Sequence, residues 1–468
     1  MTGAQEAQAA TASADELGHV HLIGVGGAGM SAIALLLAAR GLPVSGSDAR
    51  GGVVLDALAS AGVRCHVGHD AAHVEGARTV VVSSAIRATN PELVRARELG
   101  LPVLHRSVAL AALMQGRRTV AVAGAHGKTT TSAMVARALA HAGLDPSYAI
   151  GAAVDGPVGA RHGAGDVFVA EADESDGSFL AYAPAVAVVT NVEPDHLDHY
   201  GSREAFEAAF VAFAGRVVPG GWLVACADDA GAARLAAAAR AAGVRVVSYG
   251  ADTGADVRVG SWQPGGTGGT IEVSGEWGAA VLRLAVPGVH NGLNAAAAWT
   301  VARLLDVPAD VAAEGLATFT GTGRRFEDRG SAGGVRVVDD YAHHPTEVAA
   351  LLAAARPVAG QGRLLVLFQP HLYSRTRTFA GEFAAALDAA DLVVVTDVYG
   401  AREDPEPGVS GALITERMAP GRGTFVADRL EAARVVGRAA RPGDLVLTVG
   451  AGDVTELAPV VLAAVEDR

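Results

Sequence analysis

The sequence predicts an α/β protein of three domains: a Rossmann-like parallel sheet, a central ATPase-type sheet with a small antiparallel addition, and a Rossmann-like α/β domain. Two observations predict it. Short β-branched runs alternate with Ala- and Leu-rich stretches of helical length, and glycine turns join strand to helix at 24–29 and 124–127. The chain has 468 residues, half of them hydrophobic and 19% charged. At roughly 100 to 200 residues per domain, three separate cores fit this length.

Composition and charge exclude several classes of protein. A formal net charge of −13 argues against a general nucleic-acid or anionic-membrane binder, because such a surface repels phosphates. The two cysteines, Cys65 and Cys226, are too few for a disulfide framework, and no Cys/His cluster has zinc spacing. The longest apolar run near the start, 32–39, is far shorter than the roughly 20 residues that cross a bilayer. We expect a cytoplasmic protein whose polar tail, 1–18, is disordered.

The first domain is expected at 19–115. Its opening strand covers 19–23, and the glycine turn that follows leads into a helix that ends at Arg40. Further strands are expected at 43–47 and 79–83. Strands that alternate with helices in this way form parallel sheets.

The central domain is expected at 116–322, after a linker at Arg117 and Arg118. Its parallel strands are expected at 119–123, 167–170 and 186–190. Between 249 and 287 the pattern changes to short alternating strands separated by glycine clusters, which predicts an antiparallel hairpin. A helix is expected at 290–305.

The third domain is expected at 323–468, with a hinge before it. Four apolar runs predict its parallel strands: 335–338, 363–368, 391–396 and 444–449. Ligands of open parallel sheets bind outside the carboxyl ends of the strands, so polar residues that follow these strands are candidates for a site.

The first glycine turn predicts a diphosphate-binding loop. Gly24, Gly26 and Gly29 form G-x-G-x-x-G between a strand and a helix, and Asp48 ends the next strand. This spacing suits a dinucleotide such as NAD, but a nucleotide-sugar diphosphate needs the same close backbone and helix N-terminus. Tight packing of strand on helix is the alternative without a ligand. Two serines that follow a later strand, Ser83 and Ser84, would face the same crevice.

The second glycine turn carries Lys128, the one lysine among 37 basic residues. The segment 124–130 follows a strand and opens a helix, so its amides can hold a polyphosphate. Lys128 would reach the terminal phosphates, and the hydroxyl of Thr129 would bind Mg²⁺. The loop is shorter than a Walker A motif, which would need glycine where Val122 stands. A glycine turn of no function is the alternative.

Acidic residues follow the next strand of this domain: Glu171, Asp173, Glu174 and Asp176. Four carboxylates at a ligand-binding sheet edge favour bound Mg²⁺, although an acidic surface turn would look the same. The stretch 191–198 follows another strand and adds His196, which is either structural or a ligand of a second metal ion.

Polar residues also mark the remaining junctions. Asn291 would cap the helix expected at 290–305. Arg325 lies at the hinge to the third domain and could reach a transferring phosphoryl group, or be solvated. Histidines and arginines gather in the two stretches 339–345 and 369–375 after third-domain strands, which favours an anionic substrate.

Taken in this order, the motifs resemble the Mur ligase family over nearly the whole chain after the tail. The stretches that carry the resemblance are 24–31, 124–131, 171–180 (EADESDGSFL), 190–198 (TNVEPDHLD), 290–294, 321–326 (GTGRRF), 339–347 (DDYAHHPTE) and 397–408. The most similar members join L-alanine to UDP-N-acetylmuramate. The resemblance thus implies an ATP- and Mg²⁺-dependent ligase with these substrates, acting as a monomer or weak homodimer.

The resemblance also implies roles for individual residues. ATP would contact Gly124, Ala125, His126, Gly127, Lys128, Thr129, Thr130, Asn291, Asn294, Arg325 and Asp340, with the two asparagines at the adenine and Asp340 at the ribose. Metal would be held by Thr129, Glu171 and His196. The nucleotide sugar and alanine would contact Gly26, Gly27, Gly29, Met30, Ser31, Asp48, Ser83, Ser84, Tyr341, His343, His344, His371 and Arg375. The catalytic set would be Lys128, Glu171, His196, Arg325 and His344.

Three departures from the family pattern matter. Ala125 replaces the threonine usual in the phosphate loop, so a hydroxyl is missing but no backbone donor is lost. Leu372 stands where many members have arginine. Several sister ligases use a carbamylated lysine at the metals, and this chain has no lysine to spare for it.

Three other functions are left open by these residues. A ligase that recycles a preformed tripeptide onto the same nucleotide sugar shares both nucleotide sites, although the stretch 397–408 favours alanine. An NAD-dependent oxidoreductase accounts for the first glycine turn alone and leaves Lys128 unexplained. A noncatalytic nucleotide-sugar-binding protein would release no phosphate from ATP.

Overall fold

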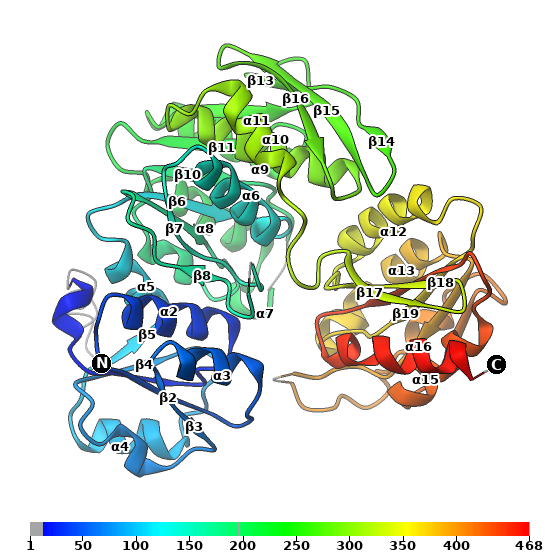
Figure 1. The fold of residues 1–468 in the computed structure, drawn as a ribbon, viewed down its shortest axis with the longest axis horizontal. Helices are drawn as coiled ribbons and strands as arrows, with labels where there is room; N and C mark the ends of the chain where they lie inside the picture. The colour runs from blue at the N-terminus through cyan, green and yellow to red at the C-terminus, as the bar shows by residue number, and fades with distance from the viewer. Residues whose placement is uncertain (1–12, 155, 195–196, 402, 468) are drawn as a thin grey trace. The chain divides into compact units, whose positions relative to one another are not determined.

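A computed structural model describes residues 13–154, 156–194, 197–401 and 403–467 (Figure 1). Its strands form three sheets, and helices lie between many of the strands in the chain, which confirms the predicted α/β class. The chain divides into two compact units. The first comprises Met1–Ser261, Ile271–Arg283 and Leu293–Phe319, and the second comprises Trp262–Thr270, Leu284–Gly292 and Thr320–Arg468.

The first sheet has five parallel strands in the order β3-β2-β1-β4-β5. Its elements are β1 (Val20–Ile23), α2 (Ala28–Ala39), β2 (Val44–Asp48), α3 (Val53–Ser60), β3 (Arg64–Val67), η2 (Ala71–Val74), β4 (Thr79–Val82), α4 (Pro91–Glu98), β5 (Val103–His105) and α5 (Arg106–Met114). In Figure 1, α2 and α3 lie on one side of these strands and α4 on the other. Strand β1 is buried along its whole length, as expected for the centre of a doubly covered sheet.

A polar cluster lies within the core of this sheet, around Glu92 of α4. The Glu92 side chain is fully buried; Ser47 donates a hydrogen bond to it at 2.5 Å, and the Nδ1 atom of His73 lies 2.7 Å away. Burial alone would raise the pKa of Glu92, but contacts with His21, Ser47 and His73 lower it to about 2. No sequence motif marks this cluster, because its members are up to 71 positions apart.

The last part of the tail that we expected to be disordered, at 14–17, is ordered. Residues Ala14–Leu17 form the 3₁₀ helix η1, and Leu17 is buried. The hydroxyl of Thr79 donates a hydrogen bond of 2.8 Å to the carbonyl of Leu17. An apolar side chain that covers the sheet and a satisfied carbonyl hold this segment in place.

The central sheet has eleven strands. Strands β13-β12-β11-β10-β6-β9-β7 are parallel, while β8 pairs antiparallel with β7, and β15 pairs antiparallel with β13 and β14. The predicted antiparallel addition at 249–287 is therefore confirmed. The strands are β6 (Arg118–Ala123), β7 (Ser147–Ala149), β8 (Ala160–Arg161), β9 (Val167–Glu171), β10 (Val186–Val189), β11 (Trp222–Cys226), β12 (Arg245–Gly250), β13 (Val257–Val259), β14 (Gln263–Gly265), β15 (Gly268–Gly275) and β16 (Gly278–Leu284).

Helices between β6 and β12 connect parallel strands of this sheet, as such crossovers require, and two more helices follow its last strand, β16. They are α6 (Lys128–His141), η3 (Ser178–Ala181), α7 (Leu197–Tyr200), α8 (Arg203–Ala214), α9 (Ala230–Ala241), α10 (Val289–Leu304) and α11 (Ala309–Ala317). Strand β6 lies between β10 and β9 in the sheet, so the loops that follow these three strands meet at one edge.

The third sheet has the order β17-β18-β22-β19-β20-β21. Its elements are β17 (Glu327–Ala332), β18 (Val335–Asp340), α12 (Pro345–Ala359), β19 (Leu364–Phe368), α13 (Tyr373–Leu387), β20 (Leu392–Val395), α14 (Ala412–Thr415), β21 (Gly423–Phe425), α15 (Arg429–Ala439), β22 (Leu445–Val449), η4 (Asp453–Leu457) and α16 (Ala458–Glu466). The strands are parallel except β17, an antiparallel edge strand that is not predicted from the sequence because its residues, EDRGSA, are mostly polar. Helices α12 and α13 cover one face of the sheet, and α15 and α16 cover the other (Figure 1).

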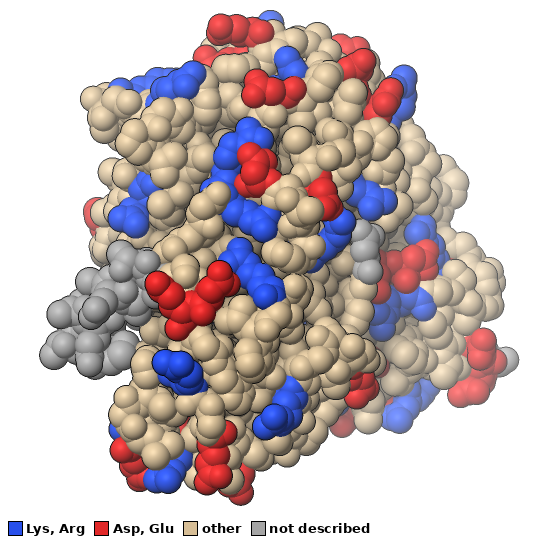
Figure 2. Space-filling view, turned by 60° about the vertical axis from the view of Figure 1, so that its left-hand side comes forward, with Lys and Arg blue, Asp and Glu red and all other residues tan. Residues whose placement is uncertain are grey.

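The surface carries both signs of charge. Figure 2 shows Lys and Arg in small groups mixed with Asp and Glu on the face drawn, with uncharged surface between them. Within the part of the chain that the structure describes, no helix is both long enough and apolar enough to cross a membrane.

Candidate active site

The phosphate loop between β6 and α6 depends on two glycines. Gly124 has φ +133° and Gly127 has φ +80°, backbone conformations that favour glycine. A Cβ atom on Gly124 would lie 2.1 Å from the Oγ1 atom of Thr190, and one on Gly127 would lie 2.7 Å from the Oδ1 atom of Asn294. Neighbouring side chains thus pack directly on the loop backbone, and α6 begins at Lys128 with its first amides facing the loop.

Lys128 is turned back over its own loop. Its Nζ atom donates hydrogen bonds to the carbonyl of Gly124 at 2.6 Å and to the Oε1 atom of Glu174 at 2.9 Å. Burial opposes the charge on Lys128, but Glu174, Asp173 and Glu171 outweigh it and raise the pKa of the ammonium group. Lys128 is therefore a cation held at the loop by a carboxylate that a phosphate could replace.

Thr129 and Glu171 meet beside Lys128. The Oγ1 atom of Thr129 lies 3.1 and 3.0 Å from the two carboxylate oxygens of Glu171, and the amide of Gly151 donates to Glu171 at 2.7 Å. A hydroxyl and a carboxylate at this spacing are oxygen donors of the kind that Mg²⁺ prefers. The third expected metal ligand, His196, lies outside the described residues.

The end of β10 fixes the other side of the phosphate loop. The amide of His126 donates to the Oδ1 atom of Asn191 at 2.9 Å, and Thr190 donates to the carbonyl of His126 at 2.5 Å. The Nε2 atom of His126 lies 3.1 Å from a carboxylate oxygen of Glu193. The sequence analysis gives no role to Thr190, Asn191 or Glu193. Their position directly after a strand, where ligands of parallel sheets bind, could have identified them as candidates.

Two further loop residues differ in burial: Thr130 is buried, whereas Ala125 is half-buried. Thr130 is 8% exposed. Ala125 contributes its carbonyl, which accepts a hydrogen bond from Lys128 at 3.2 Å. The missing hydroxyl at Ala125 therefore leaves this backbone contact unchanged.

The two asparagines of α10 differ from their predicted arrangement. Asn291 does not cap the helix, because α10 begins at Val289 and places Asn291 in its first turn. Its side-chain amide instead donates to the carbonyl of Pro287 at 2.7 Å. Asn294 lies three residues further along the helix and contacts Gly127, as described above. The structure therefore brings Asn294 to the phosphate loop and gives Asn291 a role at the start of the helix.

Asp48 stabilises the first glycine turn by a hydrogen bond to its backbone. Its Oδ2 atom accepts a hydrogen bond of 2.9 Å from the amide of Gly26. Gly27 is the exposed N-cap of α2, and Gly29 is half-buried in the first turn of that helix. Met30 and Ser31, expected to contact the nucleotide sugar, are 3% and 2% exposed, and Ser31 donates to the carbonyl of Ala28 at 3.0 Å. The accessible part of the turn is therefore its backbone near Gly27.

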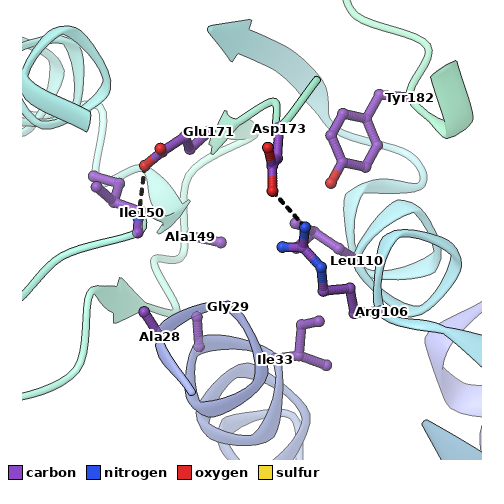
Figure 3. Close-up of a pocket in the computed structure, with 12 residues that line it drawn as sticks. Ala28, Gly29, Ile33, Arg106, Leu110, Ala149, Ile150, Glu171, Asp173 and Tyr182 are labelled. Carbon is purple, nitrogen blue, oxygen red and sulfur yellow. Dashed lines mark hydrogen bonds and ion pairs between the residues drawn. The ribbon is translucent and has the colours of Figure 1, made fainter. Parts of the chain in front are cut away.

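A cavity of about 250 Å³ extends from this turn to the acidic strand end. Its lining residues are Ala28, Gly29, Ala32, Ile33, Arg106, Leu110, Ala149, Ile150, Gly151, Glu171, Asp173 and Tyr182. Figure 3 shows Arg106 and Asp173 pointing toward one another, with Glu171 on the same side as Asp173 and with Ala28 and Gly29 of α2 at the opposite wall. The cavity thus joins the residues expected for a diphosphate to those expected for Mg²⁺.

Ser84 also reaches the acidic residues. Its hydroxyl donates a hydrogen bond of 2.5 Å to Asp176, and it lies 3.2 Å from the Nε2 atom of His105. Ser83 precedes it, directly after β4. The serine pair was expected at the crevice of the glycine turn, and the structure places Ser84 beside the acids as well. Arg106, which sequence reasoning missed, follows β5 directly and had the same strand-end signal.

In the second unit, backbone groups contact two of the charged side chains, Arg324 and Asp340. Arg324 donates to the carbonyls of Gly450 and Gly452 at 2.6 and 3.0 Å. The guanidinium carbon of Arg325 lies 5.0 Å from the ring centre of Tyr341. Asp340 accepts two backbone hydrogen bonds of 2.8 Å, from the amides of Phe326 and Ala342. Burial raises the pKa of Asp340 to about 6, although Arg325 and both amides oppose this shift.

The two adjacent histidines begin helix α12. Glu347 accepts hydrogen bonds from the amides of His343 and His344, at 2.9 and 3.2 Å. His344 is the N-cap, and its Nδ1 atom accepts from the amide of Thr346 at 3.4 Å. This contact assigns the hydrogen of a neutral His344 ring to Nε2. In that tautomer His344 is a hydrogen-bond donor, which suits holding a carboxylate better than deprotonating an amine.

The last group lies between β19 and α13. The rings of His371 and Tyr399 stack with centres 5.8 Å apart, and Arg375 is 6% exposed on α13. Leu372 is buried, with φ +69°, a rare conformation for a leucine. The leucine side chain at this position therefore packs into the protein interior.

A strand, a glycine loop with one lysine, and acidic residues at the adjacent strand end define an α/β enzyme that uses a nucleoside triphosphate. Family models identify which kind. Residues 19–118 match the Mur ligase family, catalytic domain; residues 122–302 match the Mur ligase middle domain; and residues 324–452 match the Mur ligase, glutamate ligase domain. This chain belongs to the Mur ligase family.

Individual relatives are similar along nearly the full length. A UDP-N-acetylmuramate–L-alanine ligase of Kineococcus radiotolerans is 60% identical over 459 residues, which cover 97% of each chain. One from Saccharopolyspora erythraea is 56% identical over 96% of this chain and 94% of its own. The crystal structure of the UDP-N-acetylmuramate–alanine ligase of Thermotoga maritima superposes with a TM-score of 0.81 at 30% identity, covering 96% of this chain and 99% of that one.

Proposed function

We propose that this protein is an ATP-dependent ligase that joins L-alanine to the lactyl carboxylate of UDP-N-acetylmuramate. The proposal is supported by the phosphate loop, where Lys128 is paired with a displaceable carboxylate. It is also supported by the activity named for the relatives that are 60% and 56% identical. In peptidoglycan synthesis this reaction adds the first residue of the stem peptide.

The reaction runs in two steps. The lactyl carboxylate attacks the γ-phosphorus of ATP, and the bond to the leaving ADP oxygen breaks, giving an acyl phosphate. The amine of alanine then attacks the acyl carbon, phosphate leaves, and the amine loses a proton. Positioning and charge neutralisation supply most of the catalysis in such transfers, because the protein does little covalent chemistry.

The ATP phosphates are assigned to the loop 124–130. Lys128 would exchange Glu174 for phosphate oxygens, while the α6 amides bind the same anion. Asn294 packs on Gly127, which places an amide side chain beside the loop for contact with the nucleotide. Arg325 and Asp340 remain assigned to the phosphate and ribose.

Mg²⁺ is assigned to Thr129 and Glu171, whose oxygen atoms converge, with His196 as a further ligand. When bound, the metal ion would neutralise charge on the phosphates. The amide of Gly151 holds one Glu171 oxygen, and this hydrogen bond fixes the direction in which the carboxylate points.

The nucleotide sugar is assigned to the first glycine turn, with Gly26, Gly27, Gly29, Ser83 and Ser84. The buried Met30 and Ser31 and the half-buried Asp48 shape that turn from behind. The acceptor carboxylate and alanine are assigned to Tyr341, His343, His344, His371 and Arg375. Within this set we assign His344 as a donor to a carboxylate, because its Nδ1 atom already accepts a backbone hydrogen bond.

The proposal is tested by phosphate release from ATP in the presence of Mg²⁺ and UDP-N-acetylmuramate. L-Alanine, glycine, L-serine and the stem tripeptide are supplied in turn, and the nucleotide product is weighed by mass spectrometry. We expect release that requires the nucleotide sugar and is fastest with L-alanine.

Two results would contradict the proposal. Release with the tripeptide alone would identify a recycling ligase. No release with any acceptor, combined with binding of the nucleotide sugar, would identify a noncatalytic binding protein. Binding of NADH, followed by its fluorescence, checks the oxidoreductase alternative independently.

A further inference from the structure

Arg106 occupies an unusual position in the cavity described above. It is the first residue of α5, and 24% of its side chain is exposed. A Cβ atom on Gly29 would lie 3.1 Å from the Nη1 atom of Arg106, so the guanidinium group lies directly against the first turn of α2. The glycine turn and the amide end of α2 thus share one wall of the cavity with a cation (Figure 3).

The guanidinium group is now paired with carboxylates of the acidic strand end. Its Nη2 atom donates to the Oδ2 atom of Asp173 at 2.6 Å, and the Oδ2 atom of Asp176 lies 3.8 Å from the same nitrogen. Asp173 follows β9 of the central sheet, whereas Arg106 follows β5 of the first sheet, so the pair joins the two domains of the first unit.

Charge in the cavity decides what this pair can do. Among the lining residues Arg106 is the one cation, and Glu171 and Asp173 are both acids. A diphosphate that entered at the glycine turn would meet the helix amides and Arg106, and it would be repelled by the two carboxylates. A guanidinium group can bind two phosphate oxygens at once, in the same geometry in which it binds a carboxylate.

We propose that Arg106 recognises the diphosphate of the nucleotide sugar and that Asp173 occupies its guanidinium group until that substrate binds. The proposal rests on the proposed function, which supplies a nucleotide diphosphate as substrate. It assigns a substrate-binding residue that the family motifs quoted above do not include. It also predicts that the two partners affect binding in opposite directions, since one attracts the diphosphate and the other competes with it.

The test measures the dissociation constants of UDP and UMP by titration calorimetry, for the unmodified protein and for Arg106→Ala, Arg106→Lys and Asp173→Asn. Arg95→Ala is the matched control, because Arg95 lies on α4 and pairs with an exposed carboxylate, Glu98. Thermal unfolding of each variant checks that the chain folds.

We expect the unmodified protein to bind UDP at least about tenfold more tightly than UMP, since Arg106 would contact the second phosphate, which UMP lacks. Arg106→Ala should lose most of this preference while UMP binding changes little, and Arg106→Lys should retain part of it. Asp173→Asn should bind UDP several-fold more tightly, and Arg95→Ala should match the unmodified protein.

A merely structural ion pair would give a different result. Removing either partner would then lower the unfolding temperature and weaken UDP and UMP binding alike, and this outcome would overturn the proposal. Ligation by the unmodified protein with an unchanged UDP preference in Arg106→Ala would overturn this inference and leave the proposed function standing. Absence of both UDP binding and ligation in the unmodified protein would overturn both.

Discussion

The ends of strands in the central and third sheets hold their charged residues by different means. At the ends of β6 and β9, side chains of opposite charge pair with one another, as in Lys128 with Glu174 and Arg106 with Asp173. In the third sheet, backbone groups hold a larger share of the charge: Asp340 accepts hydrogen bonds from two amides, and Arg324 donates to two glycine carbonyls while its Nε atom also lies 3.4 Å from Asp339.

The difference indicates how each site would respond to a ligand. A phosphate can replace a carboxylate partner, so the central site exchanges internal ion pairs for ligand contacts. Backbone partners cannot move away in this way. Beside the third sheet, three residues outside its strands have an uncommon backbone conformation with positive φ: Arg324, Phe326 and Leu372. We therefore expect substitutions at the central site to act on ligand binding and catalysis, and those at the third sheet to act on stability.

The largest effect is expected for Lys128→Arg. The carbonyl of Gly124 and the side chain of Glu174 enclose the ammonium group, and a planar guanidinium group is too wide for this space. We expect the variant to fold and to lose about a thousandfold in ligation rate, because a preorganised charge on the phosphates is displaced. Phosphate release measures the loss.

The control for this variant is Arg118→Lys, an Arg-to-Lys exchange at the exposed start of β6. It should leave the rate within about twofold, since surface ion pairs contribute little. An active Lys128→Arg protein would show that the lysine is not required and would remove the contrast between the two sites.

The next effect concerns the loop backbone, in Gly124→Ala. The added Cβ atom would lie 2.1 Å from the Oγ1 atom of Thr190, in a residue with φ +133°. We expect a loss of about 3 kcal/mol in the free energy of unfolding, from backbone strain and overpacking together. Urea unfolding followed by tryptophan fluorescence, to which the buried Trp299 contributes, measures it.

Gly143→Ala separates these two causes. Gly143 has φ +78°, but a Cβ atom there would have no neighbour within 4 Å. Its loss should be about 1 kcal/mol, the conformational part alone. Equal losses in the two variants would mean that contact with Thr190 does not constrain the loop.

The last effect is a pH dependence of the free energy of unfolding that arises from Asp340. The folded pKa of about 6 is above the usual unfolded value of roughly 3.9, so the folded state binds the proton more tightly. Its contribution to stability is present below about pH 4 and is lost as the pH rises through 6, on the order of 3 kcal/mol in all. Asp340→Asn should remove this slope, whatever constant amount of stability it also changes.

Calorimetric unfolding temperatures at about pH 4.5, 5.5 and 6.5, which span the window between the two pKa values, check this prediction. The useful quantity is the difference between the variant and the unmodified protein, because other carboxyls titrate in both. A difference that stays constant across this range would mean that Asp340 titrates normally.

Much of the fold was predictable because it depends on local sequence. The strand at 118–123 was expected to begin at residue 119, and the helix at 289–304 was expected to begin at residue 290. Apolar period, glycine turns and strand length act over a few neighbouring residues, so they can be recognised without knowing the fold. The polar edge strand at 327–332 was not predicted because its apolar residues do not recur at the spacing typical of a strand.

Several residues of the candidate site were also predictable from the sequence, but the side chains that they contact were not. Lys128, Thr129 and Glu171 were identified from loop type and strand ends, and the structure brings these three together. Arg106 was missed, and Asn291 was misassigned as a helix cap. Both errors arise where the outcome depends on which residues a neighbouring element presents.

By itself, then, the sequence determined that this protein is a chain of α/β domains with a lysine-bearing phosphate loop and acidic strand ends. Tertiary structure alone decided that Glu174 would hold Lys128, that Asp173 would hold Arg106, and that a buried Glu92 would lie among histidines. The physical reason is that local conformation depends on adjacent residues. Charge pairing and burial depend instead on strand order and register, which bring together residues far apart in the chain.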